Sequence, residues 1–187
     1  MTQSKIDPAH TGLDTVEYFS FEAESRSDRS IDKLQLSVTA RAGAEILNSQ
    51  FPGNIYFTSG RRSIEKQARA MAPNVVANRQ WIEQTYKNTP QRHALQEWVD
   101  NNPQANTAEM IAVGLKSVMD SWTEEEKTGF SRHITGNAFD IKPVAGDLGE
   151  RIKEAIGELP NIQWYTFSEG GLEIWHAQFH SGEPNYA

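Results

Sequence analysis

The chain has 187 residues and a net charge of −7, from 25 acidic and 18 basic side chains. This length suits one domain with a substantial core, and the negative charge argues against nucleic acid as a partner. No apolar run reaches the roughly 18 residues that a membrane span needs, so no span is expected. Cysteine is absent, which excludes disulfides and thiolate metal ligands.

The start of the chain is polar and shows little periodicity. It predicts an irregular N-terminal arm over residues 1–30, ahead of one domain over residues 31–187. The arm has no apolar core of the kind that a secretory signal peptide carries. We therefore expect synthesis in the cytoplasm without a signal peptide.

The next residues predict a helix, a turn and a short strand. Ile31, Leu34 and Val38 recur at three- and four-residue steps and predict a helix over residues 31–48. A Phe-Pro-Gly-Asn turn should end this helix. The β-formers of residues 55–58 predict the strand.

The middle of the chain predicts a series of helices. Ser63 suits the N-cap of the first, and Pro73 is expected to stop it. The amphipathic pattern is strongest after Thr107, which can cap its own helix. The run Glu124–Glu126 is interpreted as a solvated surface, because adjacent like charges need water. The helices expected here cover residues 64–72, 75–87, 91–100 and the segment that follows Thr107.

The last third predicts strands around one helix. A loop over residues 129–135 leads into a strand at 137–143, and a helix follows over 147–159. Strands at 162–167 and 172–179 are joined by Ser-Glu-Gly-Gly, a hairpin signal because glycine tolerates positive φ. The order of elements indicates an α+β fold with a small, mainly antiparallel sheet flanked by helices.

Two of the five histidines are candidate metal ligands. His10 lies in the polar arm and His93 in a helix without a nearby ligand partner, so both are interpreted as surface or packed histidines. His180 lies in the C-terminal tail and is not assigned to a site. His133 and His176 remain, because each has a carboxylate close by in the sequence.

His133 is followed after six intervening residues by Asp140, and Gly136 lies between them. Glycine lets the chain turn, so that a loop histidine can face a carboxylate on the next strand. The small Ala138 leaves room on the same strand face. On spacing alone, a His–Asp hydrogen bond without a metal is the stronger interpretation.

Glu173 and His176 belong to a second stretch, Glu-Ile-Trp-His. They would point to opposite faces of an ideal strand, so the strand must bend or end near Trp175 for both to reach one site. We hypothesise a zinc hydrolase site with ligands His133, Asp140 and His176, which keeps one position for water. Glu173 would be the general base, since a carboxylate can take the proton of a zinc-bound water.

The two stretches, Ser-x-His-x-x-Gly-x-Ala-x-Asp (131–140) and Glu-x-Trp-His (173–176), resemble the signature of the zinc D-alanyl-D-alanine peptidases. This family includes VanY-like and VanX-like carboxypeptidases and phage L-alanyl-D-glutamate endolysins. The resemblance implies a hedgehog/DD-peptidase-like fold and zinc as the cofactor. It also implies that His133, Asp140 and His176 bind the zinc, and that Glu173 activates water and later protonates the leaving amine.

A third motif agrees with the resemblance in part. Family members often carry Ser-Gly-Tyr-Arg-Ser at an early strand-to-helix turn, and residues 59–63 read Ser-Gly-Arg-Arg-Ser, with Arg61 in place of the tyrosine. The resemblance implies that Arg62 donates to the scissile carbonyl oxygen or to a substrate carboxylate. Ser131 and Gln67 are expected to bind substrate. The resemblance spans residues 31–180, but no family residue is assigned within the helical segment 70–128.

The function expected from these residues is a zinc metallopeptidase that cleaves peptidoglycan stem peptides, at an L-Ala-D-Glu or a D-Ala-D-Ala type of bond. We expect a monomer that reaches the cell wall or periplasm after phage- or secretion-type release, as an endolysin or a delivered effector. An effector would have an inhibitor or immunity protein as a partner. The alternatives are a D,D-dipeptidase or carboxypeptidase for a small amide substrate, and a non-catalytic zinc-binding domain.

Overall fold

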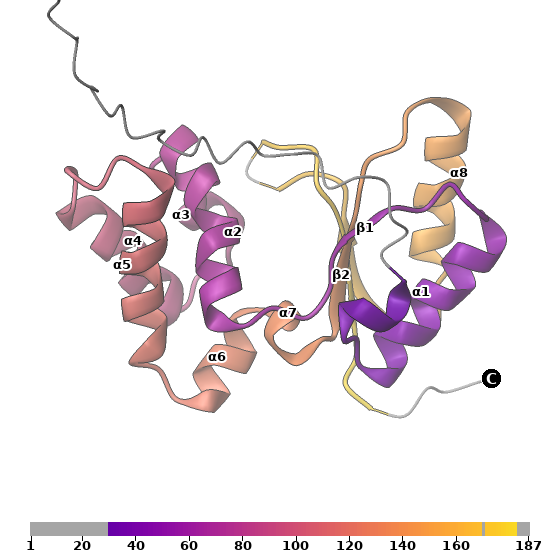
Figure 1. Ribbon diagram of the computed structural model, residues 1–187, viewed down its shortest axis with the longest axis horizontal. Helices are drawn as coiled ribbons and strands as arrows, with labels where there is room; N and C mark the ends of the chain where they lie inside the picture. The colour runs from indigo at the N-terminus through magenta and orange to yellow at the C-terminus, as the bar shows by residue number, and fades with distance from the viewer. Residues whose placement is uncertain (1–29, 170, 183–187) are drawn as a thin grey trace, which may run out of the picture.

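The computed structural model describes residues 30–169 and 171–182. It confirms the α+β class with a small antiparallel sheet: four strands lie in the order β1-β2-β4-β3, and each pair of neighbours is antiparallel. Residues 1–29, which make up nearly all of the predicted N-terminal arm, lie outside the described residues. Figure 1 shows two halves that are joined near the short helix α7 (Arg132–Thr135).

The sheet half consists of the sheet and the helices on one of its faces (Figure 1). Side chains alternate along a strand. Phe139, Ala177 and Phe179 therefore share the face that packs against the helices, and all three are buried. Asp140 and His176 occupy the alternate positions and point to the other face. The elements of the sheet half are η1 (Ile31–Leu34), α1 (Val38–Gln50), β1 (Phe57–Ser59), β2 (Ala138–Ile141), α8 (Gly146–Gly157), β3 (Ile162–Thr166) and β4 (Trp175–Phe179).

The helical half has a core of its own. Met71, Ile82 and Leu115 belong to a buried cluster that is separate from the cluster under the sheet. The predicted amphipathic helix after Thr107 is confirmed, and the Thr107 side chain caps it by accepting the Met110 N–H. Among the described residues, no helix combines the length and apolarity needed to cross a bilayer. The elements are α2 (Ile64–Ala77), α3 (Trp81–Thr85), α4 (Pro90–Asn101), α5 (Ala108–Asp120) and α6 (Glu124–Phe130).

The single helix predicted over residues 31–48 is wrong, because the structure splits it into η1 and α1. Gln35 adopts a left-handed backbone conformation with φ of 53°, which ends η1. Ser37 then caps a new helix, since its side chain accepts the N–H of Ala40. The chain thereby changes direction before the buried face of α1 begins.

The prediction that Pro73 stops a helix is also wrong. α2 continues through Pro73 to Ala77. Proline removes one backbone hydrogen bond, but Ala72 and Val75 are fully buried in the helical core, and this burial favours a continued helix. The helix predicted over residues 75–87 is accordingly replaced by the end of α2 and the short α3.

The loop predicted over residues 129–135 contains the end of α6 and the whole of α7. Gly136 ends α7 with φ of 77°, a left-handed conformation that glycine adopts at low cost. A Cβ there would also lie 2.8 Å from the Gln35 carbonyl oxygen. The chain turns sharply at this glycine and enters β2, which brings His133 back beside the strand that it precedes.

Candidate metal centre and cavity

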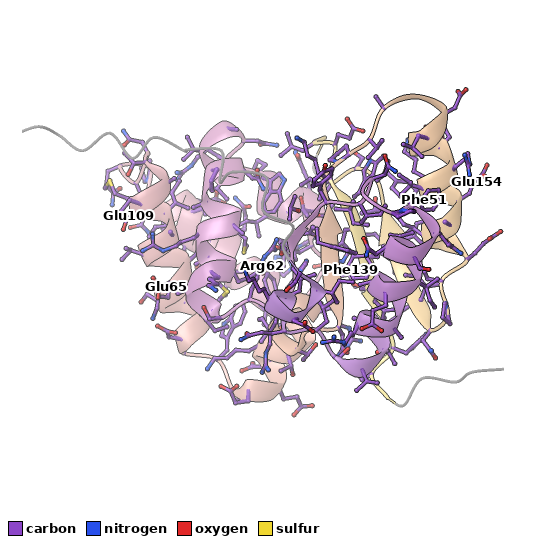
Figure 2. All side chains as sticks on the ribbon, turned by 45° about the vertical axis from the view of Figure 1, so that its right-hand side comes forward. Phe51, Arg62, Glu65, Glu109, Phe139 and Glu154 are labelled. Carbon is purple, nitrogen blue, oxygen red and sulfur yellow. The ribbon has the colours of Figure 1, made fainter. Side chains whose placement is uncertain are left out.

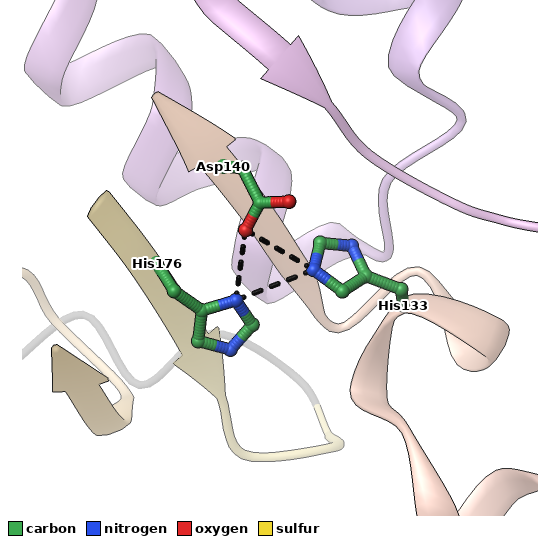
Figure 3. Close-up of side chains that lie close together, drawn as sticks. All are labelled: His133, Asp140 and His176. Carbon is green, nitrogen blue, oxygen red and sulfur yellow. Dashed lines mark hydrogen bonds and ion pairs between the residues drawn. The ribbon is translucent and has the colours of Figure 1, made fainter. Parts of the chain in front are cut away.

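The three predicted ligands meet on the face of the sheet that points away from α1 and α8 (Figure 3). His133 Nε2 lies 3.2 Å from both His176 Nδ1 and Asp140 Oδ1, and His176 Nδ1 lies 2.9 Å from Asp140 Oδ1. All three residues are buried. Within the described residues, this is the cluster of histidine and carboxylate side chains spaced closely enough to hold a metal ion.

Strand register brings two of the ligands together. Asp140 on β2 pairs directly with His176 on β4, and side chains of directly paired residues lie on the same face. A shift of one residue would send one of them into the apolar core. The third ligand, His133, comes from α7, which Gly136 turns back onto the sheet.

The geometry fits a tetrahedral zinc site. Zinc bonds of about 2.0–2.1 Å place neighbouring ligand atoms roughly 3.3 Å apart, which is close to the 2.9–3.2 Å between these atoms. Two ring nitrogens and one carboxylate oxygen leave a fourth position for water in such a site. The same donor set accepts other divalent transition metals as well.

Each ligand is oriented by a further partner, as is usual around a bound metal. His133 Nδ1 lies 2.8 Å from the carbonyl oxygen of Gly60 and donates to it, so that Nε2 keeps its lone pair for the centre. Arg62 Nη2 donates to Asp140 Oδ2 at 2.5 Å, which leaves Oδ1 for the centre. Gln178 hydrogen-bonds to the His176 ring.

The motif at residues 59–63 holds His133 in place through hydrogen bonds. Besides the Gly60 contact, the backbone N–H of Arg62 donates to the His133 carbonyl oxygen at 2.9 Å. Gly60 packs so closely against the backbone of Leu34 that a Cβ would clash. Figure 2 shows Arg62 near the junction of the two halves, whereas Phe139 lies within the sheet half.

The charges of the site favour a deprotonated carboxylate. Burial raises the pKa of Asp140, but His133, His176 and Arg62 outweigh it and hold that pKa well below its usual range. Burial lowers the pKa of His133, which favours the neutral imidazole that a metal needs. Burial also lowers the pKa of His176, but the hydrogen bond and charge of Asp140 raise it more, so its pKa lies above the ordinary value.

A cavity of about 260 Å³ opens over the three ligands, between the two halves of the molecule. The volume lies just below the range of roughly 300–1,000 Å³ that is typical of sites for drug-sized ligands. Its walls come from both halves. Its lining includes Arg62, Gln67, Tyr86, Phe130, Ser131, Trp164 and Glu169.

The predicted substrate-binding residues line this cavity but also contact one another. Ser131 Oγ and Arg62 Nη1 each lie 3.5 Å from Gln67 Oε1, and Gln67 Nε2 donates to Tyr86 Oη at 3.0 Å. Gln67 is 1% exposed, so it serves mainly as a buried link. Direct substrate contacts by Ser131, Arg62 and Gln67 stay predictions.

The structure does not bring the predicted general base into the cavity. Glu173 is exposed and lies in the irregular stretch before β4, outside the cavity lining. Glu169 does line the cavity, and burial raises its pKa. Two backbone hydrogen bonds of 2.9 Å between Glu169 and Leu172 close the turn that holds it. The role of Glu173 therefore stays a prediction without support from its position.

Sequence reasoning missed Tyr86, Trp164 and Glu169. Tyr86 follows α3 in a segment without a motif, and nothing in its local sequence distinguishes it. Glu169 belonged to the predicted hairpin turn, and a carboxylate between two strands of the site was a usable signal. His93 and His180 are exposed and lie outside the cavity, as the sequence suggested, whereas His10 lies outside the described residues.

No protein-family model, curated protein or solved structure matches this chain. The resemblance to the zinc D-alanyl-D-alanine peptidases therefore stands on the motif residues alone.

Proposed function

We propose that this protein is a zinc-dependent peptidase that cleaves the peptide stems of bacterial peptidoglycan. The observation that carries the proposal is the convergence of His133 Nε2, Asp140 Oδ1 and His176 Nδ1 at 2.9–3.2 Å beneath a cavity. A purely structural site has no need of such an opening. The motifs at residues 59–63, 131–140 and 173–176 supply the substrate class.

In this proposal, zinc is held by His133, Asp140 and His176, and it supplies an acidified water and a polarised peptide carbonyl when bound. The protein's own part is to keep the ligands in their binding states. The Gly60 carbonyl oxygen keeps the proton of His133 on Nδ1. Arg62 orients Asp140 through Oδ2, and His133, His176 and Arg62 together keep its carboxylate ionised.

Hydrolysis also needs a group that takes a proton from water and delivers it to the leaving amine. The resemblance assigns this task to Glu173, whereas position favours Glu169, because Glu169 lines the cavity and Glu173 is exposed. Burial raises the pKa of Glu169, which is the direction of shift found in carboxyl groups that act as proton donors. Glu173 is the proposed base, on the ground of the motif, and Glu169 is the alternative base, on the ground of its position in the cavity.

The charges around the cavity suit a peptide that carries free carboxylates. Lys87 and Arg132 line it from the helical half and from α7, and neither has an ion-pair partner among the described residues. Stem peptides of the peptidoglycan type bear such groups. The modest volume also favours the alternative substrate, a D,D-dipeptide or another small amide.

The test is digestion of purified peptidoglycan by the zinc-loaded protein, with mass analysis of the released fragments. Fragments cut at an L-Ala-D-Glu or a D-Ala-D-Ala type of bond support the proposal and identify the bond. Cleavage of a free D,D-dipeptide alone supports the small-substrate alternative.

A zinc-loaded protein that cleaves neither substrate, and that unfolds when chelator removes the metal, would be a non-catalytic zinc-binding domain. Delivery to the cell wall, and an inhibitor or immunity protein as a partner, follow from the proposal only if the protein cleaves peptidoglycan.

A further inference from the structure

The helical half contributes a fixed tyrosine to the cavity wall. Tyr86 follows α3, and its ring stacks on Phe130 with centroids 4.4 Å apart. Trp81 meets the same ring edge-on at 5.7 Å. Aromatic contacts on two sides leave the ring little freedom, so the hydroxyl has a defined place in the wall.

The hydrogen bonds of Gln67 determine whether the Tyr86 hydroxyl acts as donor or acceptor toward it. Gln67 Oε1 faces Arg62 Nη1 at 3.5 Å. A guanidinium only donates, so Gln67 must present its oxygen to Arg62 and its NH₂ group to the other side. Gln67 Nε2 accordingly donates to Tyr86 Oη at 3.0 Å. The phenol oxygen is the acceptor, and its own O–H proton remains available.

This proton has no acceptor within the described part of the chain, where Gln67 is the partner of the hydroxyl. Burial raises the pKa of Tyr86 above its ordinary value, and the nearby charge of Glu169 adds to the effect. The hydroxyl therefore stays protonated around neutral pH. It can donate a hydrogen bond to a bound molecule, but it cannot act there as a base.

Arg62, the donor that the sequence suggested for the substrate, is already engaged. Its Nη2 donates to Asp140 Oδ2 at 2.5 Å and its Nη1 faces Gln67. Moving the guanidinium to a substrate would remove the charge that orients a metal ligand. A neutral donor that lines the same cavity, such as the Tyr86 hydroxyl, avoids that loss.

We propose that Tyr86 donates its O–H to the carbonyl oxygen of the scissile peptide bond, and that this hydrogen bond strengthens as negative charge develops on the oxygen. This inference rests on the proposed peptidase function. It makes Tyr86 a catalytic residue contributed by the helical half, whereas the three metal ligands come from α7 and the sheet.

The test compares Tyr86→Phe with the wild type. Phenylalanine keeps the stacked ring and removes only the hydroxyl. Tyr56→Phe is the matched control, because Tyr56 is 49% exposed and lies outside the cavity lining. On a soluble stem peptide, we expect kcat of Tyr86→Phe to fall about 100-fold, the effect of losing one donor to a developing oxyanion. KM should change less than about threefold, since a bond made mainly in the transition state leaves substrate binding intact.

A second readout does not depend on turnover. A dipeptide phosphinate presents charged tetrahedral oxygens, and calorimetry should give about 10- to 100-fold weaker binding to zinc-loaded Tyr86→Phe than to wild type. Zinc affinity should be equal in the two proteins. If wild type cleaves no peptide, the proposed function fails, and the phosphinate comparison still tests Tyr86.

Equal phosphinate affinity in both proteins, or binding by neither, overturns the assignment. So does an unchanged kcat with a raised KM, which would place the contact in the ground state. Weaker zinc binding by Tyr86→Phe also overturns it, because the tyrosine would then act only through Gln67 and Arg62.

If Tyr86→Phe does not fold, 3,5-difluorotyrosine at position 86 retains the hydroxyl and lowers its pKa. Phosphinate affinity should then decline at a lower pH than in wild type, and an unchanged pH dependence counts against the donor.

Discussion

The two halves of the molecule contribute different parts of the site. The sheet half and α7 supply all three proposed metal ligands, and the register of β2 and β4 places Asp140 beside His176. The helical half supplies the wall that faces them, including Gln67, Tyr86 and Phe130. Each half has its own buried cluster. A mutation in one half should therefore affect either metal binding or substrate recognition, but not both. Arg62 and Gln67 are the exception, because Arg62 contacts both Asp140 and Gln67.

The largest effect should follow loss of a ligand. His176→Ala removes one of three donors from the centre, and zinc affinity should fall by more than the 10- to 100-fold typical of losing an outer-shell partner. Peptide hydrolysis should become undetectable. Zinc titration and peptidoglycan digestion measure both, and His93→Ala is the control because His93 is exposed and outside the cavity. Zinc binding of normal strength by His176→Ala would show that the triad is not the metal centre.

The next largest effect should identify the proton carrier. Glu173→Gln and Glu169→Gln each keep the side-chain shape and remove the titratable group. Loss of the true carrier should lower kcat by roughly 10²- to 10⁴-fold with zinc still bound, and the other variant should change kcat little. We expect the large effect in Glu173→Gln. The opposite result would assign the task to Glu169, and equal, small effects would exclude both.

A third prediction concerns the helical half alone. A Cβ at Gly114 on α5 would overlap the ring of Trp98 on α4, so Gly114→Ala should lower the free energy of unfolding by about 1–3 kcal/mol. Zinc affinity should stay unchanged, because every ligand lies outside this half. Gly129→Ala on α6 is the control, since a Cβ added there would have nothing within 4 Å. Loss of zinc binding in Gly114→Ala would mean that the two halves are not separable.

The smallest effect is a pH dependence carried by Tyr86. Its folded-state pKa is raised, so the stabilisation from its neutral form is fully present below the unfolded pKa near 10 and is lost as pH rises through the folded pKa. Tyr86→Phe cannot ionise. It should be about 1 kcal/mol less stable than wild type at pH 8, where a hydrogen bond is lost.

The gap between the two proteins should close by about pH 11, as wild type loses up to roughly 1.4 kcal/mol per pH unit above the unfolded pKa. Urea unfolding of both proteins at pH 8 and at about pH 11 measures this difference in free energy of unfolding. A gap that stays constant between them would contradict a buried, neutral phenol.

Much of the secondary structure followed from local pattern. The helix after Thr107 and the antiparallel pairing of β3 with β4 are confirmed, because caps, periodicity and turn signals act within a few residues of one another. The strand predicted from residue 172 begins only at Trp175. The failures at Gln35 and Pro73 have the opposite cause. At Pro73, Ala72 and Val75 are buried against other helices. Beside Gln35, the backbone of Leu34 and Ser37 is hydrogen-bonded to the distant Arg61 and Gly136 instead of continuing one helix.

The sequence by itself determined the chemical inventory of this protein: two histidines, an aspartate and nearby glutamates in an order that suits a metal hydrolase, on an α+β framework without cysteine. Only the tertiary structure decided which of them meet. Asp140 faces His176 because β2 and β4 pair in one register, and Glu169 enters the cavity while Glu173 does not. Tyr86 reaches the same cavity from another core. Contacts of this kind depend on how separate elements pack, and no local pattern encodes that packing.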